Sequence, residues 1–253
     1  MLKTAIKTMG LFASLATAVL LAGPAAADSM DMMDQVFHQD IPASELAAIS
    51  AAFPEGGGLD PAYVAAANDP NMHLYAQAEV TFTFIGEGAG YKNSVGYFLY
   101  DDQGKILEMN TIFSNASGWG GGLTGTGGSL LSGDSVVLGI FDEGTNIGFW
   151  VRADGYNNPN GYVYYSLEGL NPDQERHFAL WSNDAGERKV FGVEDLYNLG
   201  DQDYNDMIFS VTANPYSALS PSAGAPEPAS LLLMGSALAG LAGVGWRRRR
   251  RRG

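Results

Sequence analysis

The sequence contains no cysteine and only three histidines in 253 residues. The absence of cysteine excludes a disulfide framework, a thiolate zinc site, an iron–sulfur cluster and a cysteine nucleophile. With so few histidines, the chain also lacks the ligands of a histidine-rich transition-metal centre. Neither a G-x-S-x-G elbow nor an H-E-x-x-H motif occurs. We therefore expect a protein that is not an enzyme.

Basic residues are scarce in the middle of the chain. Of the 14 Lys and Arg, two lie within the first ten positions and six form the run 247–252. Residues 28–224 then hold six bases against 27 acids, a net charge of −21 (6 − 27). Such an acidic body repels the phosphates of nucleic acid and attracts divalent cations. We expect no nucleic-acid partner.

The first 27 residues have the pattern of a secretory signal peptide. Lys3 and Lys7 supply the positive start, an apolar stretch follows at 11–22, and three alanines at 25–27 offer a cleavage site. The sequence therefore predicts a signal peptide at 1–27 and export of the remainder across the inner membrane.

The C-terminal end also has three parts. The triplet Pro226, Glu227 and Pro228 precedes an apolar run at 229–246, which six arginines follow. A helix of that length spans roughly 27 Å, enough to cross a thin bilayer, and the arginines hold its end in the cytoplasm. This predicts a transmembrane helix preceded by a Ser/Pro/Ala linker at 214–225.

The segment 226–253 resembles the PEP-CTERM sorting signal of Gram-negative bacteria. The resemblance implies recognition by an exosortase, a membrane-embedded cysteine protease that removes the helix and the arginine tail. It further implies transient anchoring in the inner membrane, followed by transfer to the cell surface or to an extracellular exopolysaccharide matrix.

Between these ends, the hydrophobic pattern predicts an all-β fold. Apolar residues alternate with polar ones at 80–84, and strand-like runs follow at 94–100, 105–113, 135–141, 147–153, 161–166, 176–181, 189–193 and 207–212. Short strands separated by Gly, Asn and Asp turns are typical of an antiparallel β-sandwich, which we expect to be jelly-roll-like. The domain is predicted at 74–213.

The segment 28–73 is an acidic leader interrupted by prolines. Its pattern predicts short helices at 44–52, with Ser44 as the cap, and at 61–67. We expect the leader to pack on or beside the sandwich and to contain no site of its own.

The highest density of potential metal ligands lies near the end of the predicted domain. Five carboxylates occur within the 13 residues 194–206, with no Lys or Arg among them. Asp201, Asp203 and Asn205 stand at alternate positions, a spacing that can direct three oxygens to one point. Because a hard dication relieves their repulsion, we predict a Ca²⁺ site whose ligands come from Glu194, Asp195, Asp201, Asp203, Asn205 and Asp206.

This segment is not an EF-hand, since Asp206 and Thr212 occupy the places of the loop's glycine and final glutamate. A solvated acidic hairpin loop, in which Asp and Asn side chains cap their own backbone, remains the alternative.

The same segment carries a second resemblance. The pattern Phe191-Gly-x-Glu-Asp195, followed by Asp201-x-Asp-Tyr-Asn-Asp206, resembles the DUF4114 family of secreted bacterial β-rich domains, as do the blocks 87–98 and 144–149. The resemblance covers 74–213 and implies calcium binding, with relatives among adhesin-like surface proteins. It implies no activity.

We therefore expect an exported, non-catalytic protein of the cell surface or the exopolysaccharide matrix. One alternative is a lectin-like module that binds exopolysaccharide or other surface glycans through Trp119, Trp150 and the tyrosines of 162–165. Another is a secreted glycan-acting hydrolase with paired carboxylates, whose spacing in space the sequence does not reveal.

Overall fold

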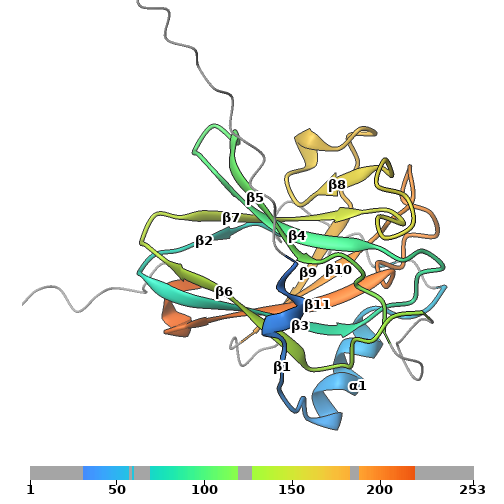
Figure 1. Cartoon of the computed structure of the whole chain (residues 1–253), viewed down its shortest axis with the longest axis horizontal. Helices are drawn as coiled ribbons and strands as arrows, with labels where there is room; N and C mark the ends of the chain where they lie inside the picture. Colours follow the sequence, from blue (N-terminus) through green and yellow to red (C-terminus); the bar gives the residue numbers. More distant parts are fainter. Residues whose placement is uncertain (1–30, 57–58, 60–68, 119–126, 183–187, 220–253) are drawn as a thin grey trace, which may run out of the picture.

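The computed structural model describes residues 31–56, 59, 69–118, 127–182 and 188–219. Its strands form two antiparallel sheets that face each other as a sandwich (Figure 1). The six-stranded sheet has the order β1 (Phe37–His38), β6 (Asp134–Phe141), β3 (Ala78–Gly86), β11 (Met207–Asn214), β10 (Lys189–Val193), β9 (Phe178–Ser182). The five-stranded sheet has the order β2 (Met72–His73), β7 (Asn146–Arg152), β4 (Ser94–Tyr100), β5 (Ile106–Phe113), with β8 (Val163–Tyr165) also paired to β7.

The nine strands predicted from the sequence correspond to β3 to β11, and the predicted bounds of β4 and β10 agree with the structure. The short strands β1 and β2 were missed because they lie in the leader. The topology departs from a jelly roll at its end. There, β9, β10 and β11 follow one another within one sheet instead of crossing between sheets.

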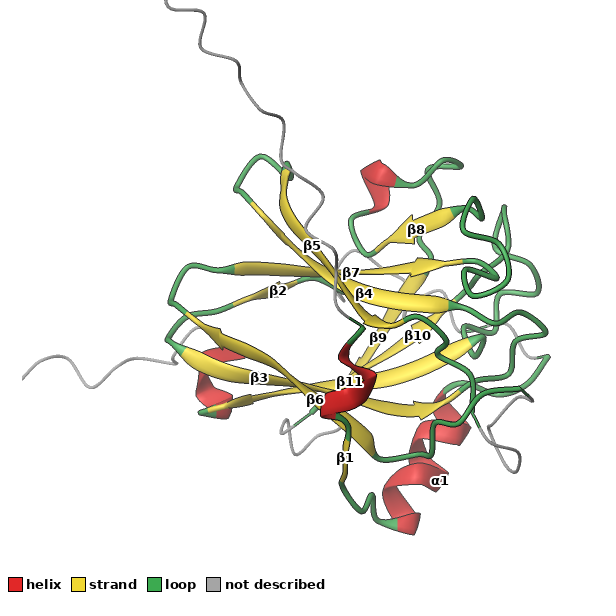
Figure 2. Ribbon diagram, in the orientation of Figure 1, coloured by secondary structure: helices red, strands yellow, loops and turns green. Residues whose placement is uncertain are grey.

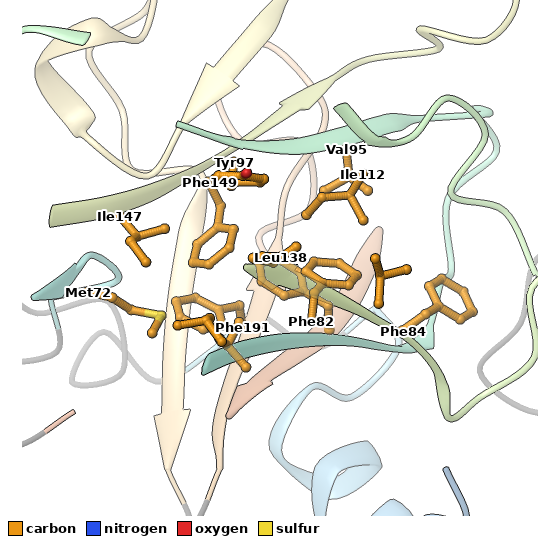
Figure 3. Packing of buried hydrophobic residues seen from close by; sticks show 14 of the residues in the cluster. Met72, Phe82, Phe84, Val95, Tyr97, Ile112, Leu138, Ile147, Phe149 and Phe191 are labelled. Carbon is orange, nitrogen blue, oxygen red and sulfur yellow. The ribbon is translucent and has the colours of Figure 1, made fainter. Parts of the chain in front are cut away.

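Aromatic and aliphatic side chains fill the space between the sheets (Figure 3). The ring of Phe209 stacks on those of Phe82 and Phe191, at centroid distances of 4.6 and 4.8 Å. Phe149, from the opposite sheet, approaches Phe209 to 5.1 Å. These four rings are fully buried, so the alternation read from the sequence does place one face of each sheet in a common core.

A second apolar cluster covers the outer face of the six-stranded sheet, beside helix α1 (Ala43–Ala52; Figure 2). Ile49 and Phe53 from the leader pack there on Ile85 and Ile208, so these outward-facing residues of β3 and β11 are buried as well. The predicted cap is wrong. Pro42 occupies the N-cap position and Ser44 lies inside the helix, because α1 begins one residue earlier than expected.

The described residues also form three short 3₁₀ helices: η1 (Met32–Gln35), η2 (Glu168–Leu170) and η3 (Tyr216–Leu219). The last of these lies at one end of the sandwich. The backbone of Tyr75, after β2, donates to the carbonyl of Ala218 in η3 at 2.8 Å. The loops that follow β3, β7 and β10 lie at the other end (Figure 1).

Among the described residues, no helix is both long and apolar enough to cross a bilayer. The predicted signal peptide, the helix at 61–67, Trp119, and the sorting segment with Pro226, Glu227 and Pro228 lie outside the described residues.

Candidate metal centre

The acidic loop 194–206 joins β10 to β11, which are neighbours in the six-stranded sheet. An isolated bridge pairs Val193 with Asn205, so the loop returns to the strand from which it leaves. Its backbone achieves this return through residues in the left-handed region: Asn198, Leu199, Gly200, Gln202 and Tyr204. Asp201 and Asp203, seven and nine positions after Glu194, therefore lie beside it.

Three of the predicted ligands meet at one point. Carboxylate oxygens of Glu194, Asp201 and Asp203 lie within 4.8 Å of one another. Glu194 and Asp203 are buried, whereas Asp201 is exposed at the mouth. A Cβ at Gly200 would lie 3.1 Å from Glu194 Oε2, so the loop backbone also passes close to this carboxylate.

Glu194 is held by one of its oxygens only. Oε1 accepts from the backbone N–H of Tyr204 at 3.0 Å, whereas Oε2 is buried and has no hydrogen-bond partner in the described part of the chain. Burial, with a smaller contribution from the charges of Asp203 and Asp201, raises the pKa of Glu194 from 4.5 to about 7. A cation bound at Oε2 would satisfy this oxygen and offset the cost of burying the charge.

The leader completes the wall of the site. Asp203 Oδ2 accepts from the backbone N–H of Gly56 at 2.8 Å, and the Asn205 amide donates to Glu55 at 3.1 Å and to Asp203 at 2.9 Å. Glu55 and Gly56 of the leader therefore belong to this wall, so the leader packs beside the candidate site. Asn205 links two carboxylates through its amide nitrogen in this arrangement.

Asp195 and Asp206 form a separate pair beside the three carboxylates. The backbone N–H of Asp195 donates to Asp206 Oδ2 at 2.8 Å, and Asp195 Oδ2 accepts from the amide of Asn93 at 2.7 Å. Burial, followed by the charge of Asp195, raises the pKa of Asp206 from 3.8 to about 8, and burial raises the pKa of Asp195 too. The Asp195 side chain thus contacts Asn93 and not the group of three.

A cleft of about 340 Å³ opens over the group, lined by Glu55, Asp201, Asp203 and Asp206 together with Asn205. No Lys or Arg lies among the described residues that line it. At neutral pH, a bound proton or a bound cation would therefore relieve the repulsion that remains between these carboxylates.

His177, which directly precedes β9, supports the loop, a role that the sequence did not reveal. Its Nδ1 lies 2.7 Å from the carbonyl oxygen of Glu194, which only accepts, so Nδ1 is the donor. Its Nε2 lies 3.0 Å from Asp173 Oδ2, which also accepts from the backbone N–H of Asn198 at 2.9 Å. His177 and Asp173 thereby hold the loop at two places.

Two aromatic residues of the lectin alternative, Trp150 and Tyr164, are buried. Trp150 is 6% exposed, and its indole N–H donates to the carbonyl of Asn110 at 3.1 Å. Tyr164 is fully buried. Trp150 and Tyr164 were candidates because aromatic residues cluster in this part of the sequence. Such clustering does not distinguish the core face of a strand from its surface.

Comparison with known families confirms both resemblances. Residues 141–214 match the family described as domain of unknown function DUF4114, and residues 225–251 match the PEP-CTERM protein-sorting motif. The first match is shorter than the predicted 74–213, but it includes the whole acidic loop. The second includes Pro226, Glu227 and Pro228. No curated protein and no solved structure matches the chain.

The class of the protein follows from these two matches. The sorting motif makes the chain an exported protein that is processed through an exosortase. More particularly, the chain carries a PEP-CTERM sorting motif and a DUF4114 segment that forms part of a β-sandwich.

Proposed function

We propose that this is a non-catalytic, calcium-binding protein of the cell surface or the exopolysaccharide matrix, where the sorting signal at 226–253 delivers it. The observation that carries the calcium site is the buried, unpartnered Oε2 of Glu194 in a group that also contains Asp201 and Asp203. A structural ion at this point would lock the loop between β10 and β11 and attach the leader to the sandwich.

Calcium fits this group better than other ions do. Every candidate ligand is an oxygen, as hard cations prefer, and extracellular calcium modules bind weakly with irregular geometry. Magnesium requires a near-ideal octahedron, and zinc prefers nitrogen and sulfur. The charge of three carboxylates also exceeds what one univalent ion neutralises.

The groups around the cleft support binding in preference to catalysis. The described residues that line it offer carboxylates and one amide, with no Ser, Thr or Lys as a nucleophile. His177, the nearest imidazole to Glu194, is fully buried and engages the Glu194 carbonyl and Asp173 through its two nitrogens. It is therefore a supporting residue and not a general base.

Calcium titration of the full chain tests the site directly. We expect one calcium to bind with a dissociation constant of about 10⁻⁴–10⁻³ M, as in other extracellular modules. The substitution Asp201→Asn should weaken binding at least about tenfold with little effect on folding, since Asp201 is exposed. Isothermal titration calorimetry measures both.

The matched control is Asp40→Asn, because the Asp40 side chain is fully exposed and belongs to no cluster of ligands. It should bind calcium like the wild type. Equal affinities for wild type and Asp201→Asn, or no heat with either, would contradict the proposed site.

Delivery to the surface should depend on the Pro-Glu-Pro triplet. In the native host, we expect Glu227→Ala to leave the chain in the membrane fraction with its arginine tail attached, because the processing enzyme no longer recognises it. Ser222→Ala, in the linker just upstream, is the control. Immunoblots of cell fractions and the mass of the C-terminal peptide report the outcome, and normal processing of Glu227→Ala would argue against this route.

A further inference from the structure

A second hollow lies beside the acidic cleft and has a different chemistry. This tyrosine pocket, of about 260 Å³, is formed where three loops meet at the same end of the sandwich. Tyr91 comes from the β3–β4 loop, Tyr162 from the β7–β8 loop and Tyr197 from the acidic loop. Its wall also includes Asp154, Asn158 and Tyr164, whereas the metal centre uses none of the four tyrosines.

Three of these tyrosines are exposed although aromatic side chains gain most from burial. Tyr91, Tyr162 and Tyr197 are 42%, 57% and 48% exposed, and the rings of Tyr162 and Tyr197 lie 5.5 Å apart. Tyrosine carries an apolar ring and a polar end, which makes it a common contact residue in binding sites. The apolar C–H face of a sugar ring is a natural partner for such a surface.

The wall of the pocket also holds an unused hydrogen-bonding group. The hydroxyl of Tyr164 is buried and has no partner in the described residues, and its ring is fixed by stacking on His177 at a centroid distance of 3.7 Å. A buried hydroxyl without a partner is costly, and a ligand hydroxyl would satisfy it. Asp154 and Asn158 add polar groups at the rim, and Asp154 Oδ1 is fixed by the Asn157 amide at 2.7 Å.

The charges at the pocket discriminate between classes of sugar. Asp154 and Asp195 lie in its wall, and no Lys or Arg is among the described lining residues. Uronic acids and sulfated sugars would be repelled, whereas a neutral ring presents only hydroxyls and C–H groups.

We propose that the tyrosine pocket binds a pyranose unit of a neutral glycan, with the ring held against Tyr162 and Tyr197 and one sugar hydroxyl bonded to Tyr164. This goes beyond the calcium site, since ring stacking requires no ion. Leu196 lies in the walls of both hollows, so the two sites are neighbours.

The test is calorimetric titration of the full chain with cellohexaose, laminarihexaose, mannohexaose and hexagalacturonate, each with added calcium and again with EGTA. We expect binding of at least one of the three neutral hexasaccharides and none of hexagalacturonate. Tyr162→Ala should weaken the affinity about tenfold, the effect of losing one aromatic contact, and so should Tyr197→Ala. Tyr162→Phe, which keeps the ring, should retain most of it.

The control is Tyr75→Ala, another exposed tyrosine, at the far end of the sandwich, which should bind like the wild type. Thermal melts establish that each variant folds. The proposal is overturned if no neutral hexasaccharide binds at about 10 mM, if both alanine variants bind unchanged, or if hexagalacturonate binds best. If the chain binds sugar but does not bind calcium, only the proposed metal site is refuted.

Discussion

We expect calcium to raise the melting midpoint of the full chain by about 5–10 °C when its concentration exceeds the dissociation constant about a hundredfold, and Glu194→Gln to abolish this rise. Binding to the native state alone at that excess contributes about 2.7 kcal/mol, and each kcal/mol shifts the midpoint of a chain of this size by about 2–4 °C. Thermal melts at pH 8 with calcium or EGTA measure the effect.

The behaviour of Glu194→Gln without calcium separates a metal ligand from a merely structural residue. Glutamine keeps the acceptor for the Tyr204 N–H, removes a buried charge, and places an amide donor where the unpartnered Oε2 faces Asp201 and Asp203. The variant should therefore melt above the wild type in EGTA and gain nothing from calcium.

Glu79→Gln, on an exposed position of β3, removes the same charge away from the site and should keep the full calcium response. If Glu194→Gln still responds to calcium like the wild type, the carboxylate is no ligand.

The second large effect concerns pH. The folded-state pKa values of Glu194 and Asp206 are raised, to about 7 from 4.5 and to about 8 from 3.8. Between the unfolded and folded values, the native state binds more protons than the unfolded state, so stability decreases as pH rises. In EGTA we therefore expect the stability that these two groups contribute to be complete below about pH 4 and to be lost as the pH rises to about 8.

Calcium should reverse this trend, because it binds the deprotonated carboxylates and competes with their protons. The calcium affinity should fall about tenfold for each unit by which the pH is lowered, for each proton that must leave the site. Urea midpoints at pH values near 5.5, 7 and 8.5, with and without calcium, test both statements. A calcium-free stability that increases across this range contradicts the raised pKa values.

The strands were predictable because period-two alternation reports directly which side chains meet in the core. Phe82 lies where the alternation at 80–84 places it, and Phe191 and Phe209 lie in two further predicted strands that join the same core. The dense carboxylates of 194–206 likewise predicted a cluster, and three of them do meet. Both inferences rest on local spacing, which the chain preserves when it folds.

Long-range partners were not predictable. Gly56 and Asp203 are 147 positions apart, and no spacing rule pairs them. The same holds for the tyrosine pocket, because Tyr91 and Tyr197 come from separate loops, whereas the aromatic cluster read from the sequence included the buried Trp150 and Tyr164.

Neighbouring residues of an extended chain point to opposite sides, which is a sequence signal that Glu194 and Asp195 have different partners. The structure directs Glu194 towards Asp201 and Asp203, and Asp195 towards Asn93.

The direction of β11 determines what the protein presents to its surroundings. This strand leaves the acidic loop at Met207 and delivers the chain to η3 at the other end, about 25 Å away for eight residues of strand. The C-terminal end of the described residues therefore lies at the end of the sandwich opposite both hollows.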